Sequence, residues 1–355
     1  MFRFIKLFPV VLFFAGCAAK KQVSTIPPGK DEKHLKNITQ LTFGGDNAEA
    51  YWSFDGKSVT FQSNNPAWGL QCDQIFTSKI SRFGDSAYKP NLISTGQGRT
   101  TCSYFMPDNK HILFASTHLD NKSCPPPPES KGAYAWPLYK GYDIFISDLK
   151  GKITTRLTSE PGYDAEATVS PDGKKIVFTS TRSGDLELWI MDIDGSNQKQ
   201  LTFGLGYDGG AFFSPDSKKI VFRSSRPQTE EEITKYKDLL NKDLVEPTHM
   251  EIYTINADGT NLKQITTLGK ANWAPFYHPG NKKIIFSSNH KSKRGYDFQL
   301  YMIDEDGSNL EQITTESIFN SFPMFSPNGK QLIFSSNRNN GGGRATNLFV
   351  ADWID

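Results

Sequence analysis

The 355-residue sequence has neither a strong net charge nor a long hydrophobic run. Its 40 Lys and Arg and 38 Asp and Glu give a formal net charge of +2. A nearly neutral surface argues against nucleic acid as a partner, because a phosphate backbone requires a basic face. The apolar run that ends at Phe14 is too short to span a bilayer.

The sequence also lacks the short motifs of several enzyme classes. It contains no GxSxG nucleophile motif, no HExxH and no glycine loop of the kind that holds phosphate. The three consecutive glycines at residues 341–343 are interpreted as a loop, because no helix is predicted after them. No motif therefore indicates a catalytic class.

Cysteine is scarce, and its four copies show no CxxC spacing, which disfavours a metal site built on cysteine. FAGC at residues 14–17 resembles the lipobox of bacterial lipoproteins, and Arg3 and Lys6 precede the apolar run as in a signal peptide. The alternative is an ordinary signal cleaved near Ala18. The lipobox interpretation has three parts: a signal peptide at residues 1–16, a lipidated Cys17 and a polar tether at residues 17–35.

One stretch of the sequence, SPDGKKIVFTSTR at residues 170–182, recurs in similar versions along the chain. Six versions of a stretch indicate a repeat architecture. The other five are SFDGKSVTFQSN from residue 53, FMPDNKHILFAST from 105, SPDSKKIVFRSSR from 214, HPGNKKIIFSSN from 278 and SPNGKQLIFSSNR from 326.

Each repeat predicts four strands from its alternating hydrophobic residues and turn residues. In the third repeat, Pro171 and Gly173 favour a hairpin turn after the innermost strand. The four strands are expected at residues 166–169, 175–180, 186–192 and 198–202. Residues 36–355 are therefore predicted to form an all-β, six-bladed β-propeller with four antiparallel strands per blade.

The last repeat ends before its outermost strand, at NLFVADW from residue 347. NITQLT at residues 37–42 matches the fourth strands NQKQLT from residue 197 and NLEQIT from residue 309. We therefore predict that residues 37–42 complete the sixth blade and close the ring, which removes an unpaired sheet edge.

SPDGKKIVFTS, DGSN and KQLT, in this order, resemble the TolB-type propeller repeat over residues 36–355. Full-length TolB proteins carry an α/β domain ahead of the propeller, and here only the short tether is expected in that place. The chain more closely resembles exported TolB-like propeller lipoproteins that carry RTTCSYF (99–105), CPPPP (124–128) and ANWAPFYHPG (271–280). The resemblance implies a partner in the cell envelope, since TolB-type propellers engage a peptidoglycan-associated lipoprotein.

Insertions between the second and third strands fall on one face of a propeller. Repeat proteins collect such insertions on the face used for binding, although they can also cap a channel. In the insertion at residues 227–249, Thr229 and Glu232 predict a capped helix with Ile233, Tyr236 and Leu240 on one side. The five insertions are residues 64–71, 117–141, 227–249, 289–295 and 337–344.

Several side chains are candidates for binding on this decorated face. Tyr134, Trp136 and Tyr139 could contact a peptide or glycan, or lie buried over the second blade. Copies of GYD could ring the channel mouth, or serve as a loop device in which Asp accepts backbone N–H bonds. The residues of the two GYD copies before innermost strands are Tyr163, Asp164, Tyr207 and Asp208.

His118, His249 and His290 also map to the decorated face and could ligate a metal, as in some propeller lyases that act on acidic sugars. After lipidation of Cys17, three cysteines remain on the same face. A disulfide between Cys72 and Cys102 is predicted, with Cys102 to Cys124 as the alternative.

The sequence thus predicts a monomeric, non-catalytic lipoprotein, anchored on the periplasmic side of the bacterial outer membrane, that binds an envelope protein, peptide or glycan. No cofactor is expected. The alternative is a metal-dependent carbohydrate-active enzyme, a lyase or hydrolase, that uses a divalent metal held by the three histidines.

Overall fold

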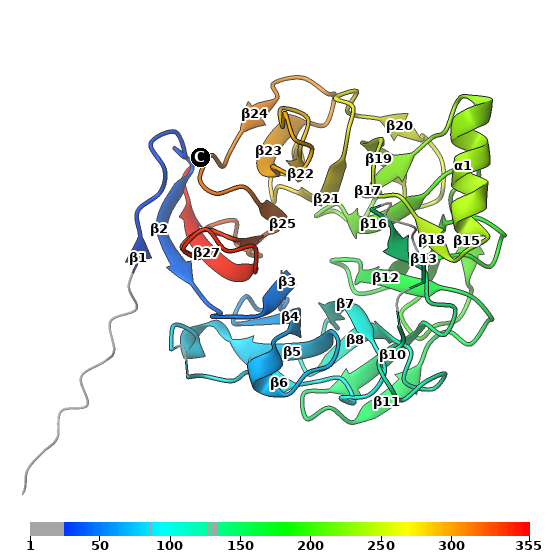
Figure 1. Ribbon diagram of the computed structural model, residues 1–355, viewed down its shortest axis with the longest axis horizontal. Coiled ribbons are helices and arrows are strands. Elements are labelled where there is room, and N and C mark those ends of the chain that lie inside the picture. The colour runs from blue at the N-terminus through cyan, green and yellow to red at the C-terminus, as the bar shows by residue number, and fades with distance from the viewer. Residues whose placement is uncertain (1–24, 86, 127, 130–133) are drawn as a thin grey trace, which may run out of the picture.

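The computed structural model describes residues 25–355, apart from residues 86, 127 and 130–133. Six of its sheets form blades arranged around a central axis (Figure 1), and a seventh has two short strands. The predicted six-bladed β-propeller with four antiparallel strands per blade is confirmed. The predicted signal peptide and Cys17 lie outside the described residues.

The first three blades each contain four strands, which run in order from the innermost strand outward. Blade one has β3 (Asp46–Trp52), β4 (Ser58–Asn64), β5 (Gln74–Lys79) and β6 (Asn91–Leu92), with 3-10 turns at Pro66–Trp68 and Ile80–Arg82. Blade two has β7 (Thr100–Phe105), β8 (His111–Ser116), β10 (Asp143–Asp148) and β11 (Ile153–Arg156). Blade three has β12 (Asp164–Val169), β13 (Lys175–Ser180), β14 (Glu187–Asp192) and β15 (Lys199–Gln200).

The other three blades repeat this order. Blade four has β16 (Asp208–Phe213), β17 (Lys219–Ser225), β19 (Met250–Asn256) and β20 (Lys263–Gln264). Blade five has β21 (Asn272–Tyr277), β22 (Lys283–Ser288), β23 (Gln299–Asp304) and β24 (Glu311–Gln312). Blade six has β25 (Asn320–Phe325), β26 (Gln331–Ser336), β27 (Asn347–Trp353), β2 (Leu35–Gln40) and β1 (Thr25–Ile26).

The repeated SPDG stretch folds as a tight turn held by its own side chains. Ser170 Oγ donates a hydrogen bond to Asp172 at 2.7 Å and accepts one from the N–H of Lys175 at 2.9 Å. Gly173 adopts φ +72°, and a Cβ atom there would lie 2.9 Å from Cγ of Pro107 in the preceding blade. Glycine thus serves both the turn and the close packing of neighbouring blades.

The core lies between adjacent blades. The second strand of every blade carries one phenylalanine at the same place in the repeat. Burying each of these side chains stabilises the fold by about 2 kcal/mol relative to its exposure. All six are 0% exposed: Phe61, Phe114, Phe178, Phe222, Phe286 and Phe334.

Residues from both ends of the chain share the sheet of blade six. β2 pairs antiparallel with β27, with Thr39 opposite Val350. The segment before β2, predicted to be tether, is folded onto the propeller as far back as β1, which pairs with β2. Within it, Glu32 is 1% exposed and forms an ion pair with Arg338 at 2.9 Å. The predicted tether boundary at residue 35 is therefore wrong, because Glu32 is needed to neutralise a buried guanidinium.

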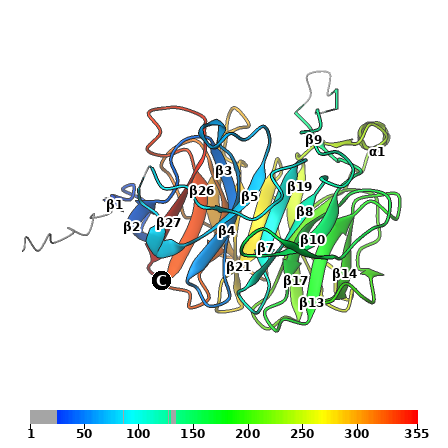
Figure 2. The same cartoon turned by 90° about the horizontal axis from the view of Figure 1, so that it is seen from below.

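The two long insertions meet on one side of the propeller (Figure 2). In the insertion of blade two, β9 (Trp136–Pro137) pairs antiparallel with β18 (Leu244–Val245) of the insertion of blade four. The predicted helix is confirmed as α1 (Glu230–Leu240), with the Thr229–Glu232 capping box in place. Tyr236, on the inner side of α1, is buried, so the helix packs on the decorated face.

Candidate functional site in the central channel

A cavity of about 350 Å³ lies on the propeller axis. Every innermost strand reaches it at an equivalent residue, where the register with the second strand shifts at a β-bulge. Bulges re-aim side chains, and here they turn one residue per blade toward the axis. These six lining residues all have positive φ: Glu49, Cys102, Glu166, Gly210, Ala274 and Phe322.

Glu166 belongs to a buried network across blades three and four. The Arg223 Nη2 donates to Glu166 Oε1 at 2.6 Å, and the N–H of Gly210 donates to Glu166 Oε2 at 2.6 Å. The Tyr207 hydroxyl donates to the same carboxylate and accepts from Arg223. The carboxylate thus has a full set of partners, which a buried charge requires. Arg223 Nε has no hydrogen-bond partner among the described residues.

Two glycines of blade four make room for this network. A Cβ atom on Gly210 would lie 1.8 Å from Nη1 of Arg223, and one on Gly209 would lie 2.3 Å from Oε2 of Glu166. Both distances are far below van der Waals contact. The glycine pair is therefore required for Arg223 to reach Glu166.

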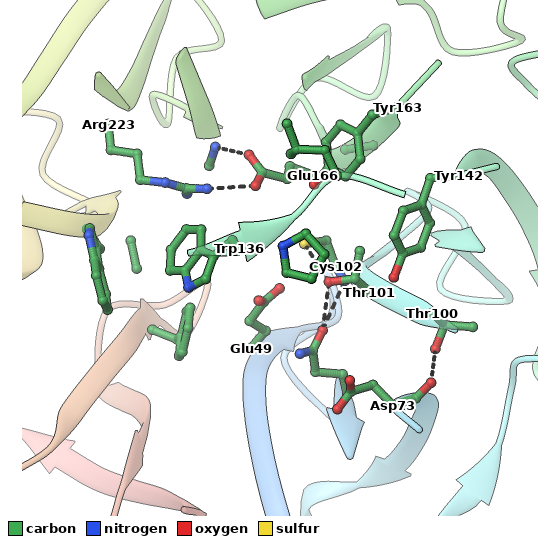
Figure 3. A pocket seen from close by; sticks show the side chains of 18 of the residues that line it. Glu49, Asp73, Thr100, Thr101, Cys102, Trp136, Tyr142, Tyr163, Glu166 and Arg223 are labelled. Carbon is green, nitrogen blue, oxygen red and sulfur yellow. Dashed lines mark hydrogen bonds and ion pairs between the residues drawn. The ribbon is translucent and has the colours of Figure 1, made fainter. Parts of the chain in front are cut away.

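Glu49 and Cys102 occupy the equivalent places in blades one and two, and both are half-buried in the cavity wall. Burial raises the pKa of Glu49 to about 7, and the nearby Glu166 adds to the rise, whereas a hydrogen bond from Cys102 opposes it. Burial also raises the pKa of the Cys102 thiol well above its ordinary value. No Lys or Arg forms an ion pair with Glu49 in the described part of the chain. Figure 3 shows both side chains beside Trp136 in the cavity.

The two long insertions supply the roof of the cavity. Trp136 packs on Trp273 of blade five at a ring distance of 5.1 Å, and the guanidinium of Arg223 lies 5.3 Å from the Trp136 ring centroid. Trp273 Nε1 donates to the carbonyl of Pro247 at 3.0 Å. The insertions of blades two and four are thus joined to each other and to the channel wall.

The structure places the predicted aromatic residues at this cavity. Tyr134, Trp136 and Tyr139 line it from the roof, and Tyr134 is 63% exposed. Tyr163 and Tyr207 line its wall and are buried. Tyr134 is exposed, so it is not buried over the second blade, whereas Trp136 and Tyr139 are partly covered.

The predicted acidic residues do not enter the cavity. Asp164 forms an ion pair with Arg182 at 2.6 Å, and Asp208 forms one with Arg226 at 2.6 Å. Neither aspartate lines the cavity. They hold the arginine that follows the second strand of their own blade, so their role is structural and the predicted binding role is not supported.

The three predicted histidines are not brought together. His118 and His290 follow second strands, at the place where blades three, four and six carry arginine. Each ring bonds a serine two residues earlier, Ser116 at 2.9 Å and Ser288 at 2.8 Å. His249 is exposed beside α1. In the ranges that the structure describes, no three His, Cys, Asp or Glu side chains are grouped so that they could hold a metal ion.

The disulfide links Cys72 to Cys124, with 5.9 Å between their Cα atoms, and Cys102 is a free thiol. The predicted Cys72–Cys102 pair and its Cys102–Cys124 alternative are both wrong. The bulge of β7 turns Cys102 toward the propeller axis, whereas Cys72 and Cys124 meet where the long insertion crosses blade one. The bond ties that insertion to the neighbouring blade.

Sequence reasoning missed Glu49, Glu166 and Arg223. An alignment of the six repeats would have revealed Arg223. At the place of Arg223 the other second strands carry smaller side chains, such as Thr179 and Ser287, and only Gln62 is also large and polar. Gln62 likewise serves the site, since its Oε1 accepts from Thr101 and from the N–H of Cys102.

Comparisons with known proteins agree with this architecture. Residues 240–351 match the TolB beta propeller domain, and residues 138–246 match the Tricorn protease N-terminal beta propeller domain. The fold defines the chain as a six-bladed β-propeller. Its last blades are similar to the TolB beta propeller domain, as the repeats predicted.

Solved structures show the same fold. Putative TolB from Agrobacterium tumefaciens is 20% identical with a TM-score of 0.57, over 88% of this chain and 91% of that one. TolB from Acinetobacter baumannii is 21% identical with a TM-score of 0.53, over 87% of this chain and 63% of that one. An oligogalacturonate lyase in complex with manganese is 12% identical with a TM-score of 0.52, over 94% and 96%. At these identities the likeness concerns the fold alone.

No helix in the described ranges is both long and apolar enough to cross a membrane.

Proposed function

We propose that this protein is a non-catalytic lipoprotein of the bacterial cell envelope that binds a protein, peptide or glycan through its decorated face. The observation that carries the proposal is the pairing of β9 with β18, which joins two insertions over the mouth of the central cavity. Insertions that only covered a surface would not need to meet at the one place where all six blades converge.

The chemistry of this face suits binding. Tyr134 stands exposed at the rim, while Trp136 and Trp273 pack together as an aromatic base beneath it. Aromatic side chains supply large contact areas at low entropic cost and are frequent hot spots of recognition. The lipid anchor at Cys17, the periplasmic side of the outer membrane and a monomeric state complete the proposal.

A substitution at the rim tests the binding face. Tyr134→Ala should weaken capture of the envelope partner by about tenfold, as expected for loss of one aromatic hot spot. Leu262→Ala is a matched control, because Leu262 is 49% exposed in the turn between the third and fourth strands, on the opposite face. Capture is measured by crosslinking in envelopes followed by purification. Equal weakening by both variants, or by neither, would contradict the choice of face.

The alternative, a metal-dependent carbohydrate-active enzyme, requires ligands that meet at one point. The donor set does not favour it, because His118 and His290 are held by serines of their own blades. Metal analysis of the purified protein separates the two functions. Stoichiometric metal that is lost in a His118→Ala, His249→Ala, His290→Ala triple variant would refute the binding proposal.

A further inference from the structure

We propose that the central cavity holds a protonated amine of the bound ligand, and that Glu49 is the residue that recognises it. This inference deepens the proposed function and rests on it, since it names the chemical group that enters the cavity. The class of ligand is a compound with a primary ammonium group on a small polar or aliphatic body, such as an amino sugar or a lysine side chain.

The charges around the cavity leave one carboxylate without a cation. Glu166 is paired with Arg223, and Asp73 is paired with Arg99 at 2.5 Å. Glu49 has no such partner in the part of the chain that the structure describes. A carboxylate that is removed from water is costly unless a cation compensates it. Among the described residues, Glu49 is therefore the one acidic side chain of the cavity wall that a cation from a ligand could pair.

The backbone conformation at Glu49 is unusual and fits a carboxyl group that faces the cavity. Its φ of +54° is unusual for a residue with a side chain and directs the carboxyl into the cavity through the bulge of β3. Strained residues of this kind concentrate at binding and active sites. An apolar residue at this position would satisfy packing without a buried charge, as Phe322 does in blade six.

The walls favour a cation over an anion. Trp136, Tyr163 and Phe322 line the cavity, and aromatic rings attract cations to their faces. The two arginines that line the cavity are each paired already, Arg223 with Glu166 and Arg99 with Asp73. An anion would have to compete with these carboxylates, whereas an ammonium group meets Glu49, which forms no ion pair with a Lys or Arg of the described residues.

The cavity also limits the size of the group. A volume of about 350 Å³ accommodates a monosaccharide or one amino-acid side chain but not a folded partner. The rest of the ligand would lie on the decorated face beside Tyr134.

Binding should depend on pH in a defined direction. The pKa of Glu49 is raised to about 7, and the charged or titratable groups facing it are Cys102, Glu166, Arg223, Asp73 and Tyr51. An ammonium group binds the ionised carboxylate, so affinity should rise as the pH increases through about 7. The amine of the ligand must stay protonated over this range, which suits an alkyl amine.

The test uses matched probes on the purified full chain at about pH 7.5. One pair is glucosamine and N-acetylglucosamine, and the other is Nα-acetyl-lysine amide and its Nε-acetylated form. Calorimetry and the fluorescence of Trp136 and Trp273 report binding. We expect the amine of at least one pair to bind about tenfold more tightly than its acetylated form, the difference expected for a charge-assisted hydrogen bond. The pair that responds identifies an amino sugar or a peptide as the source.

Glu49→Gln keeps the side-chain size and should abolish this preference, while Glu231→Gln, on the exposed side of α1, should retain it. Equal binding of amine and acetylated probes, binding of no probe, or a preference that survives Glu49→Gln would each overturn the inference. Thermal unfolding of each variant shows that the fold persists. If the unmodified protein captures the envelope partner but shows no preference for amine probes, this inference alone is refuted. If it prefers amine probes but captures no partner, the proposed function alone is refuted.

Discussion

Glu49 combines a left-handed backbone with a carboxyl group that loses water on folding, and both features have thermodynamic consequences. Its pKa rises from 4.5 in the unfolded chain to about 7 in the folded one. A raised carboxyl pKa costs nothing below about 4.5, destabilises increasingly as the pH rises from 4.5 to about 7, and has its full cost above that. The full cost is about 3 kcal/mol.

Glu49→Gln should therefore stabilise the protein at about pH 8 by up to about 3 kcal/mol and change little at about pH 4. Urea unfolding at the two pH values measures the difference. Glu187, whose pKa burial also raises to about 7, remains in both proteins and cancels in the comparison. An equal effect at both pH values would show that Glu49 is not a buried carboxyl with a raised pKa.

Gly210 offers a second test at the residue scale. Gly210→Ala should destabilise the protein by clearly more than the about 1–2 kcal/mol that a left-handed alanine costs, because its Cβ would displace Arg223 from Glu166. Gly69→Ala is the matched control, since Gly69 also has positive φ but has open space around its Cβ position. Urea unfolding of both variants gives the comparison. Equal losses would mean that Arg223 moves aside without cost.

At the scale of elements, the strands and α1 were predictable because each carries its own local pattern. Six repeats show the same turn residues, and Thr229 and Glu232 mark the start of the helix. β9 and β18 were not predicted, since each has two residues and depends on a partner about 100 positions away in the chain. The residues at the centre of the cavity were not predicted for a related reason: a β-bulge decides where the side chains of Glu49 and Glu166 point.

The disulfide is tested at this scale. Alkylation of the unreduced protein after unfolding in denaturant should label Cys102 and leave Cys72 and Cys124 unlabelled, and peptide mass spectrometry should recover the latter two joined. Reduction should make the insertion at residues 117–141 more sensitive to protease, because the bond constrains that loop. Recovery of a Cys72–Cys102 peptide would contradict the structure.

At the scale of the whole molecule, the segment before β2 stabilises the ring at the junction of blades five and six. Burial alone would raise the pKa of Glu32, but Arg338 and the N–H of Gly29 lower it below its ordinary value. Glu32 also accepts hydrogen bonds from the N–H groups of Thr315 and Glu316. The segment therefore connects blade six to the end of blade five.

Glu32→Ala should destabilise the propeller by about 3–5 kcal/mol, because it leaves the Arg338 charge buried without a partner. Asp31→Ala, at the exposed neighbouring residue, should change stability by no more than about 0.5 kcal/mol. The lowered pKa makes this contribution present above about pH 4.5 and lost as the pH falls. Urea midpoints for the two variants measure it. Similar midpoints would show that the segment does not fasten the ring.

Site-specific photocrosslinking in living cells tests the central claim, that the decorated face binds a partner. A photoreactive amino acid is placed at residue 134 on the rim of the cavity and, as the control, at residue 262 on the opposite face. We predict a discrete crosslinked product from residue 134 and none from residue 262. A product from residue 262 alone, or from neither position, would contradict the proposed function.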